Sequence, residues 1–70
     1  MKMCEAGKRI LVTHEAPDGT PRAFAIGPAN DPDGVREEAQ YRLDAYKMER
    51  TVLGDPLGCA RFVRREVVLG

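Results

Sequence analysis

Residues 17–19, with the sequence Pro-Asp-Gly, lie between two apolar stretches and constrain the fold of this 70-residue chain more than any other feature. Proline supplies the first turn dihedral, aspartate tolerates the second, and glycine accepts a positive φ. The stretches on either side, residues 8–16 and 22–26, are rich in residue types that favour strands. Together they predict a β-hairpin in which Ala16 pairs with Thr20 across a three-residue turn.

The register of this hairpin decides which side chains share a face. Pairing from the three-residue turn puts Phe24 opposite Val12 and Ile26 opposite Ile10, so the large apolar side chains gather on one face. A two-residue turn would shift the pairing by one residue and put Phe24 beside Thr13 instead. We favour the first register. Its other face carries Arg9, Leu11, Thr13, Glu15, Ala23, Ala25 and Gly27.

Residues 35–53 form the longest stretch without glycine or proline, and they predict an α-helix. Asn30, Asp31 or Asp33 can cap its start, and Gly54 closes its end. At about 100° per residue, its apolar residues form a stripe that we expect to cover the sheet. The residues of this stripe are Val35, Ala39, Leu43, Tyr46 and Leu53.

Residues 59–69 predict a third strand, with a bulge or an edge position near Arg64 and Arg65, where the apolar alternation is imperfect. The order of elements predicts a two-layer α+β fold, β-β-α-β. Its three-stranded mixed sheet has the order 2-1-3, with one helix on one face and no cover on the other. We expect residues 1–70 to form a single small domain, with residues 1–7 as a loosely ordered N-terminal segment.

The composition argues against several classes of protein. The 11 basic residues balance the 11 acidic ones, and a net charge of zero argues against a dedicated binder of bulk nucleic acid. No apolar run reaches the roughly 18 residues of a membrane span, and the first residues lack the apolar core of a signal peptide. The 2 cysteines are too few for a disulfide scaffold. We therefore expect a cytoplasmic protein with no membrane contact.

Three residues, His14, Cys4 and Cys59, are the candidates for nucleophilic or metal chemistry. On the predicted topology the two cysteines lie at opposite ends of the sheet, too far apart for a disulfide or a shared metal ion. His14 and Cys59 share one end, but no orienting carboxylate or oxyanion donor is evident there, and we expect His14 to lie at the rim of the sheet. The sequence therefore predicts no catalytic residue, no metal site and no enzymatic activity.

The acidic loop at residues 31–34 matches a calcium-binding loop in its first positions alone. The fifth and twelfth positions of such a loop would be Val35 and Arg42, neither of which has a side-chain carboxylate. Helix capping explains the acidic residues instead. The glycines form neither a phosphate loop nor a dinucleotide fingerprint, so we expect no cofactor.

Two apolar surfaces have no partner in the predicted fold, and they indicate a protein contact. One is the uncovered sheet face, and the other is a second helix stripe of Tyr41, Ala45, Met48 and Val52. A domain of this size gains stability by association. We therefore expect a small protein-interaction or regulatory module, as a homodimer or with another protein. The interface candidates are Leu11, Tyr41, Met48, Val52, Val63 and Val67.

An alternative function is contact with nucleic acid through a basic terminal strand. The candidate residues are Lys8, Arg9, Arg61, Arg64 and Arg65. Few aromatic side chains accompany them for base stacking, and arginines on a terminal strand also protect a sheet edge. We therefore rank this function second.

The order of elements resembles that of HicB-type antitoxin domains, with Glu37-Glu38-Ala39 early in the helix. The resemblance is one of architecture and implies the same hairpin, helix and strand arrangement. No distinctive motif is shared across the chain, so the resemblance implies no partner and no residue role.

Overall fold

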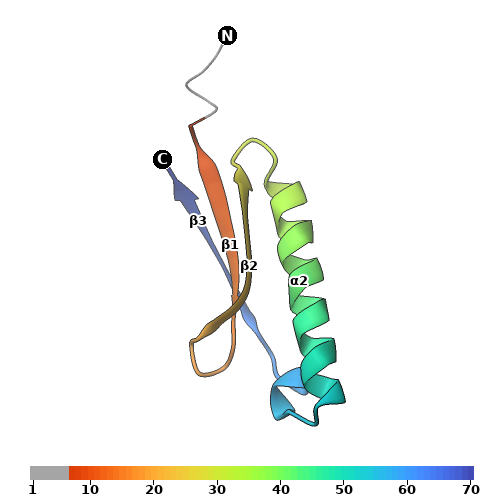
Figure 1. The fold of residues 1–70 in the computed structure, drawn as a ribbon. Helices are drawn as coiled ribbons and strands as arrows, with labels where there is room; N and C mark the ends of the chain where they lie inside the picture. The colour runs from red at the N-terminus through yellow and green to blue at the C-terminus, as the bar shows by residue number, and fades with distance from the viewer. Residues whose placement is uncertain (1–6) are drawn as a thin grey trace.

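The computed structural model describes residues 7–70 as a hairpin, a helix and a third strand (Figure 1). The elements are β1 (Arg9–Glu15), β2 (Pro21–Pro28), α2 (Pro32–Val52), the 3₁₀-helix η1 (Pro56–Cys59) and β3 (Val63–Leu69). The predicted N-terminal segment lies outside the described residues, apart from its last residue. α2 packs on one face of the sheet, so the predicted α+β class with one helix is confirmed.

The sheet has the predicted order β2-β1-β3, but it is antiparallel and not mixed. β1 lies in the centre and runs antiparallel to both neighbours. β2 and β3 run in the same direction, but they are not adjacent and so form no parallel ladder. β3 pairs with β1 in an unbroken register from Val63 to Leu69, so of the two alternatives near Arg64 the edge position holds and the bulge does not.

The chain between α2 and β3 forms η1, which takes in Cys59, the first residue of the predicted strand. Asp55 caps η1, because its carboxylate accepts a hydrogen bond from the Leu57 N–H at 2.9 Å, and Pro56 occupies the first turn. η1 packs against the end of α2. Residues 59–62, which belong to the predicted strand, therefore precede β3.

The hairpin turn forms as the sequence predicts. The Ala16 N–H donates to the Thr20 carbonyl at 2.9 Å, and the Gly19 N–H donates to the Ala16 carbonyl at 2.8 Å. Gly19 has a φ of 87°, a conformation that glycine adopts without strain. The Asp18 carboxylate accepts the Thr20 N–H at 2.9 Å, and this hydrogen bond lowers the pKa of Asp18.

Beyond the turn, the predicted register is wrong. The pairing shifts by one residue between His14 and Glu15, where Arg22 is an extra residue in β2. This β-bulge puts Phe24 opposite Thr13, on the face away from α2. The large apolar side chains of β2 therefore lie on the face opposite to the predicted one.

Close packing between α2 and β2 explains why the small residues of β2 face the helix. Ala23 and Ala25 are buried there, and a Cβ atom on Gly27 would lie 2.7 Å from Val35 Cγ2. A side chain as large as Phe24 in this layer would force the helix away from the sheet. The bulge therefore brings the small face of β2 under α2.

α2 begins at the capping residue that the sequence offers. Asp31 is the N-cap, its carboxylate accepts the Gly34 N–H at 3.3 Å, and Pro32 follows in the first turn. At the other end Gly54 has a φ of 76°, and its N–H donates to the Thr51 carbonyl at 3.0 Å. The predicted helix is thus correct in position, with a start a few residues earlier.

The predicted core stripe of α2 is correct over most of its length. Val35, Ala39 and Leu43 are buried, and Tyr46 is half-buried. Leu53 is 65% exposed, contrary to the prediction, because it follows the last helical residue at the point where the chain turns.

The core is small and lies between α2 and two of the three strands. Its buried cluster consists of Ile10, Val12, Ala25, Val35 and Ala39. α2 packs on β2 and β1, whereas every residue of β3 is exposed. Residues 7–70 contain no helix with the length and apolar character that a membrane span requires.

Candidate interaction surfaces

The sheet face that points away from α2, called the open face below, carries half-exposed apolar side chains. Ile26 of β2 and Val67 of β3 lie on either side of Leu11, and Phe24 lies in the next row. Phe24, Ile26 and Val67 are 53%, 48% and 50% exposed, because nothing in residues 7–70 packs on them. The apolar residues of the open face are Leu11, Phe24, Ile26, Val63, Val67 and Leu69.

The sequence predicts half of the apolar residues of the open face. Leu11, Val63 and Val67 lie on the open face, as the sequence predicts. Phe24 and Ile26 were missed because the bulge shifts them to it. The signal that could have located them is the run of small residues at alternate positions of β2, which marks a strand face with a helix packed closely against it.

The third strand, β3, is bare on its other face as well. Val68 lies opposite buried Ile10 and therefore faces the side on which α2 packs, yet it is 64% exposed. Figure 1 shows β3 on the side of the sheet away from α2. β3 also ends the sheet, and no strand of residues 7–70 lies beside its outer edge. Apart from the Arg36 side chain, which reaches Glu66, it is thus uncovered on both faces and along one edge.

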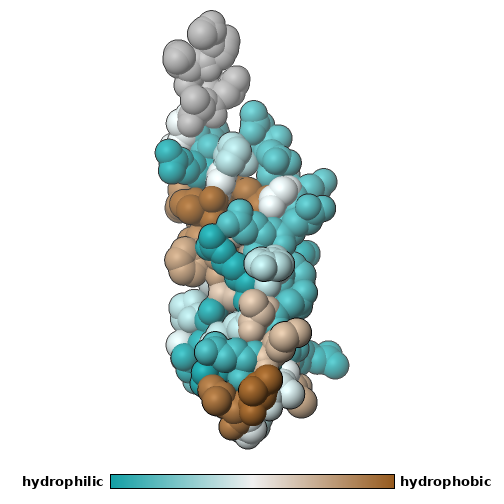
Figure 2. Space-filling model, turned by 45° about the vertical axis from the view of Figure 1, so that its right-hand side comes forward, coloured by the Kyte–Doolittle hydropathy of each residue, from teal (hydrophilic) through white to brown (hydrophobic). Residues whose placement is uncertain are grey.

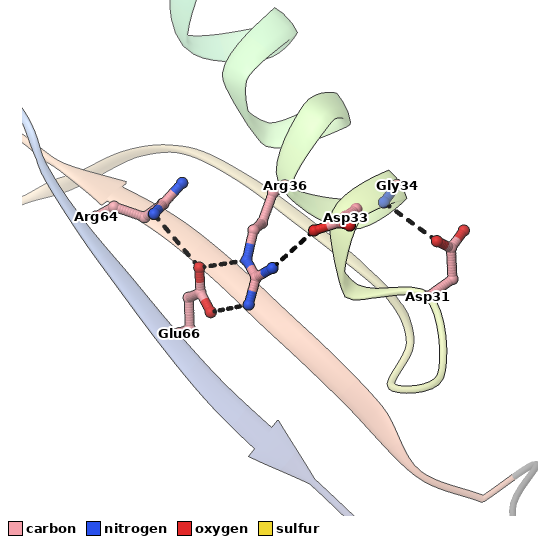
Figure 3. Close-up of polar contacts among 6 residues, drawn as sticks. All are labelled: Asp31, Asp33, Gly34, Arg36, Arg64 and Glu66. Atoms are coloured by element: carbon pink, nitrogen blue, oxygen red, sulfur yellow. Dashed lines mark hydrogen bonds and ion pairs between the residues drawn. The ribbon is translucent and has the colours of Figure 1, made fainter.

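An ionic cluster joins the start of α2 to the middle of β3 (Figure 3). The Arg36 guanidinium binds the Glu66 carboxylate through two bonds of 2.8 and 2.9 Å, and it also binds Asp33 at 2.9 Å. Arg64 Nε lies 3.3 Å from the same Glu66 carboxylate. The hydrogen bonds from Arg36 lower the pKa of Glu66 and raise the pKa of Arg36. Two arginines and two carboxylates balance, so the cluster carries no net charge.

The basic residues predicted to contact nucleic acid do not form one band. Arg64 lies on the α2 side of β3 beside Glu66, whereas Arg65 lies on the open face and binds Glu15 at 2.8 Å. Arg9 lies opposite Leu69, and Lys8 and Arg61 are exposed outside the strands. Alternation along β3 therefore sends neighbouring arginines to opposite faces.

The second helix stripe is exposed along the length of α2. Tyr41, Met48 and Val52 are 74%, 69% and 79% exposed. Figure 2, in which α2 comes forward, shows a mostly hydrophilic side with hydrophobic atoms at its lower end, where α2 ends, and in a second patch toward its upper left. Apolar side chains spaced singly along a charged helix are ordinary on a protein surface, so this stripe is a weaker candidate than the open face.

The histidine predicted to lie at the rim of the sheet is buried instead. His14 shares a strand face with Ile10 and Val12, which points toward α2, and it is 4% exposed. Its Nε2 atom has no hydrogen-bond partner among the described residues. Cys59 is exposed in η1, and Cys4 lies outside the described residues.

The buried histidine predicts a pH dependence of stability. Burial lowers the pKa of His14 below 6.5, Arg64 acts in the same direction, and Asp44 acts in the opposite one. The unfolded chain binds a proton below about pH 6.5 that the folded chain resists, so the free energy of unfolding should fall between about pH 7 and 5.5. Denaturant unfolding at these two pH values should show a smaller fall for His14→Leu. An equal fall in the two proteins would contradict this assignment, because most carboxylates titrate at lower pH.

Residues 7–70 show no pocket and no cluster of three or more side chains that could hold a metal ion. Comparison of the chain with models of protein families, with curated proteins and with solved structures gave no match. The exposed surfaces described above are therefore the basis for a functional proposal.

Proposed function

We propose that this protein is a non-enzymatic interaction or regulatory module of the cytoplasm that self-associates as a homodimer. The observation that carries the proposal is the incomplete cover of the sheet. α2 packs on β2 and β1, while the open face and the whole of β3 stay exposed. The dimer would then present the open face to a protein partner.

The size of the domain supports association. A 70-residue chain has a limited core, and its stability amounts to a few kcal/mol without help from another chain. The largest fully buried side chain of the described residues is a valine, Val12, while Phe24 and Ile26 remain half exposed. Exposed apolar residues that lie side by side across a sheet mark contact sites more often than scattered ones do. Association with a second copy and with a protein partner would therefore bury surface that the fold leaves in water.

Contact with nucleic acid receives less support. Of the five basic candidates, Arg64 and Arg65 already have carboxylates at 3.3 and 2.8 Å. The two residues also lie on opposite faces of β3, so they cannot contact one strand of phosphates together. A surface neutralised in this way releases few counterions on binding.

Sedimentation of the chain from the low micromolar range upward tests self-association. We expect the solution mass to rise to that of a dimer. Val67→Lys should weaken the association by about tenfold or more, because it puts a charge on β3, the strand that the fold leaves uncovered. Met48→Lys is the matched control, since it changes an equally exposed residue of the second helix stripe, and it should leave the association unchanged.

A native chain that remains a monomer at the highest concentration would overturn the proposal. If Met48→Lys alone weakened the association, the helix stripe would be the interface in place of the sheet.

A further inference from the structure

We propose that the second copy binds along the outer edge of β3, antiparallel to it, in a register centred on Arg65. The two sheets would then form one continuous sheet with β3 of each copy at its centre. This inference rests on the proposed self-association and assigns the surface that carries it. It follows from the exposure of β3, from its charge pattern and from the position of α2.

The outer edge of β3 is free and regular. β3 is the last strand of the sheet, all seven of its residues are exposed, and its register with β1 is unbroken. Natural sheet edges are usually protected by proline, bulges or short strands. β3 has none of these features, and its charged residues are the one protective device it retains. Those charges decide which second strand it accepts.

A two-fold axis perpendicular to the sheet limits the possible registers. Such an axis keeps each side chain on its own face, so a residue can lie opposite only a residue of the same face. In the register centred on Arg65, Arg64 lies opposite the partner's Glu66, and Glu66 lies opposite the partner's Arg64. In the next register, centred on Glu66, two glutamates would meet and no arginine would lie opposite a glutamate. The charge pattern therefore favours the register centred on Arg65.

The open face is compatible with the same register. Val63 lies opposite the partner's Val67 on both sides of the axis, which gives two apolar cross-strand pairs. At the axis Arg65 meets the partner's Arg65, a repulsive pair in isolation. Each Arg65 binds Glu15 of its own chain at 2.8 Å, and this carboxylate offsets the repulsion.

On the α2 side of the sheet, Arg64 can exchange its own Glu66 for the partner's Glu66. Glu66 is fixed by two bonds from Arg36, while Arg64 is the more loosely bound partner at 3.3 Å and is about half exposed (Figure 3). Arg64 can therefore turn to the partner's Glu66 without breaking the contact between α2 and β3. α2 itself does not block the edge, because it packs over β2 and β1.

Charge reversal tests the register. Arg64→Glu puts two glutamates opposite each other at both pairs, and Glu66→Arg puts two arginines there. Each variant alone should associate about tenfold more weakly than the native chain. An equimolar mixture of the two variants should recover the native association, because every opposed pair is then an arginine and a glutamate. A mixture that associates as weakly as each variant alone would overturn the register.

A disulfide test is independent of these charges and of the contact that Glu66 makes with Arg36. In a chain with Cys4→Ser and Cys59→Ser, Arg65→Cys places two thiols directly opposite each other, about 4.5–5.5 Å apart between Cα atoms, within disulfide range. Val67→Cys is the control, because the two copies of residue 67 lie about 13 Å apart in this register. Oxidation should give a covalent dimer with the first variant and not with the second.

The outcomes separate the two proposals. A dimer that cross-links through position 65 supports both. A dimer by sedimentation that fails to cross-link there overturns the β3 pairing and leaves self-association standing. A monomer at every concentration overturns both.

Discussion

The Val12→Ala variant should lose about 2–3 kcal/mol of unfolding free energy, a large part of the stability of so small a domain. Among residues 7–70, Val12 is the one side chain of its size with no exposed surface, and it lies on the central strand under α2. The substitution leaves a cavity under α2. This cavity cannot close, because β1 is held between two paired neighbouring strands. Thermal unfolding followed by circular dichroism should show a midpoint lower by about 10–20 °C.

Val68→Ala is the matched control, because it makes the same change in the neighbouring strand directly beside the core. Val68 is 64% exposed, so this variant should lose less than about 1 kcal/mol when measured at low concentration, where self-association is small. Equal losses in the two variants would mean that α2 covers β3 as well, contrary to the described packing.

Gly58→Ala should be the second most damaging substitution, because the new methyl group has no room beside α2. A Cβ atom on Gly58 would clash with Thr51 Oγ1 and lie 2.7 Å from the Thr51 backbone nitrogen. The side chain of Thr51 can rotate, but the helix backbone cannot move without loss of its hydrogen bonds. η1 must therefore shift away from α2, at a cost of about 1–3 kcal/mol or more.

Cys59→Ala, at the adjacent exposed position of η1, is the control and should change the stability by less than about 0.5 kcal/mol. Denaturant unfolding of the two variants gives the comparison. A native-like midpoint for Gly58→Ala would show that η1 is not held closely against α2.

The turn and the helix could be predicted from the sequence because local chemistry determines them. Gly19 provides the positive φ that the hairpin turn needs, and Asp31 provides the helix cap. The β-bulge at Arg22 could not be predicted in the same way. It arises from the close approach of α2 to β2, which is a tertiary contact, and no turn residue signals it.

The candidate surface was predicted in part for the same reason. The exposure of Val63 and Val67 follows from the strand order, which the sequence predicts. The place of Phe24 depends on the register, and the bulge moves Phe24 to the open face. The burial of His14 follows from the packing of α2 on that side of β1, since a lone histidine in a strand gives no signal of its depth.

Hydrogen exchange of the backbone amides at low and high protein concentration tests whether a second copy pairs with β3. If a second copy pairs with the outer edge of β3, alternate amides of this strand should become protected as the concentration rises, because they gain hydrogen-bond partners. The amides of β2, at the other edge of the sheet, should exchange equally at both concentrations. Protection of β3 that does not change with concentration, or a change confined to β2, would contradict the pairing of a second copy with β3.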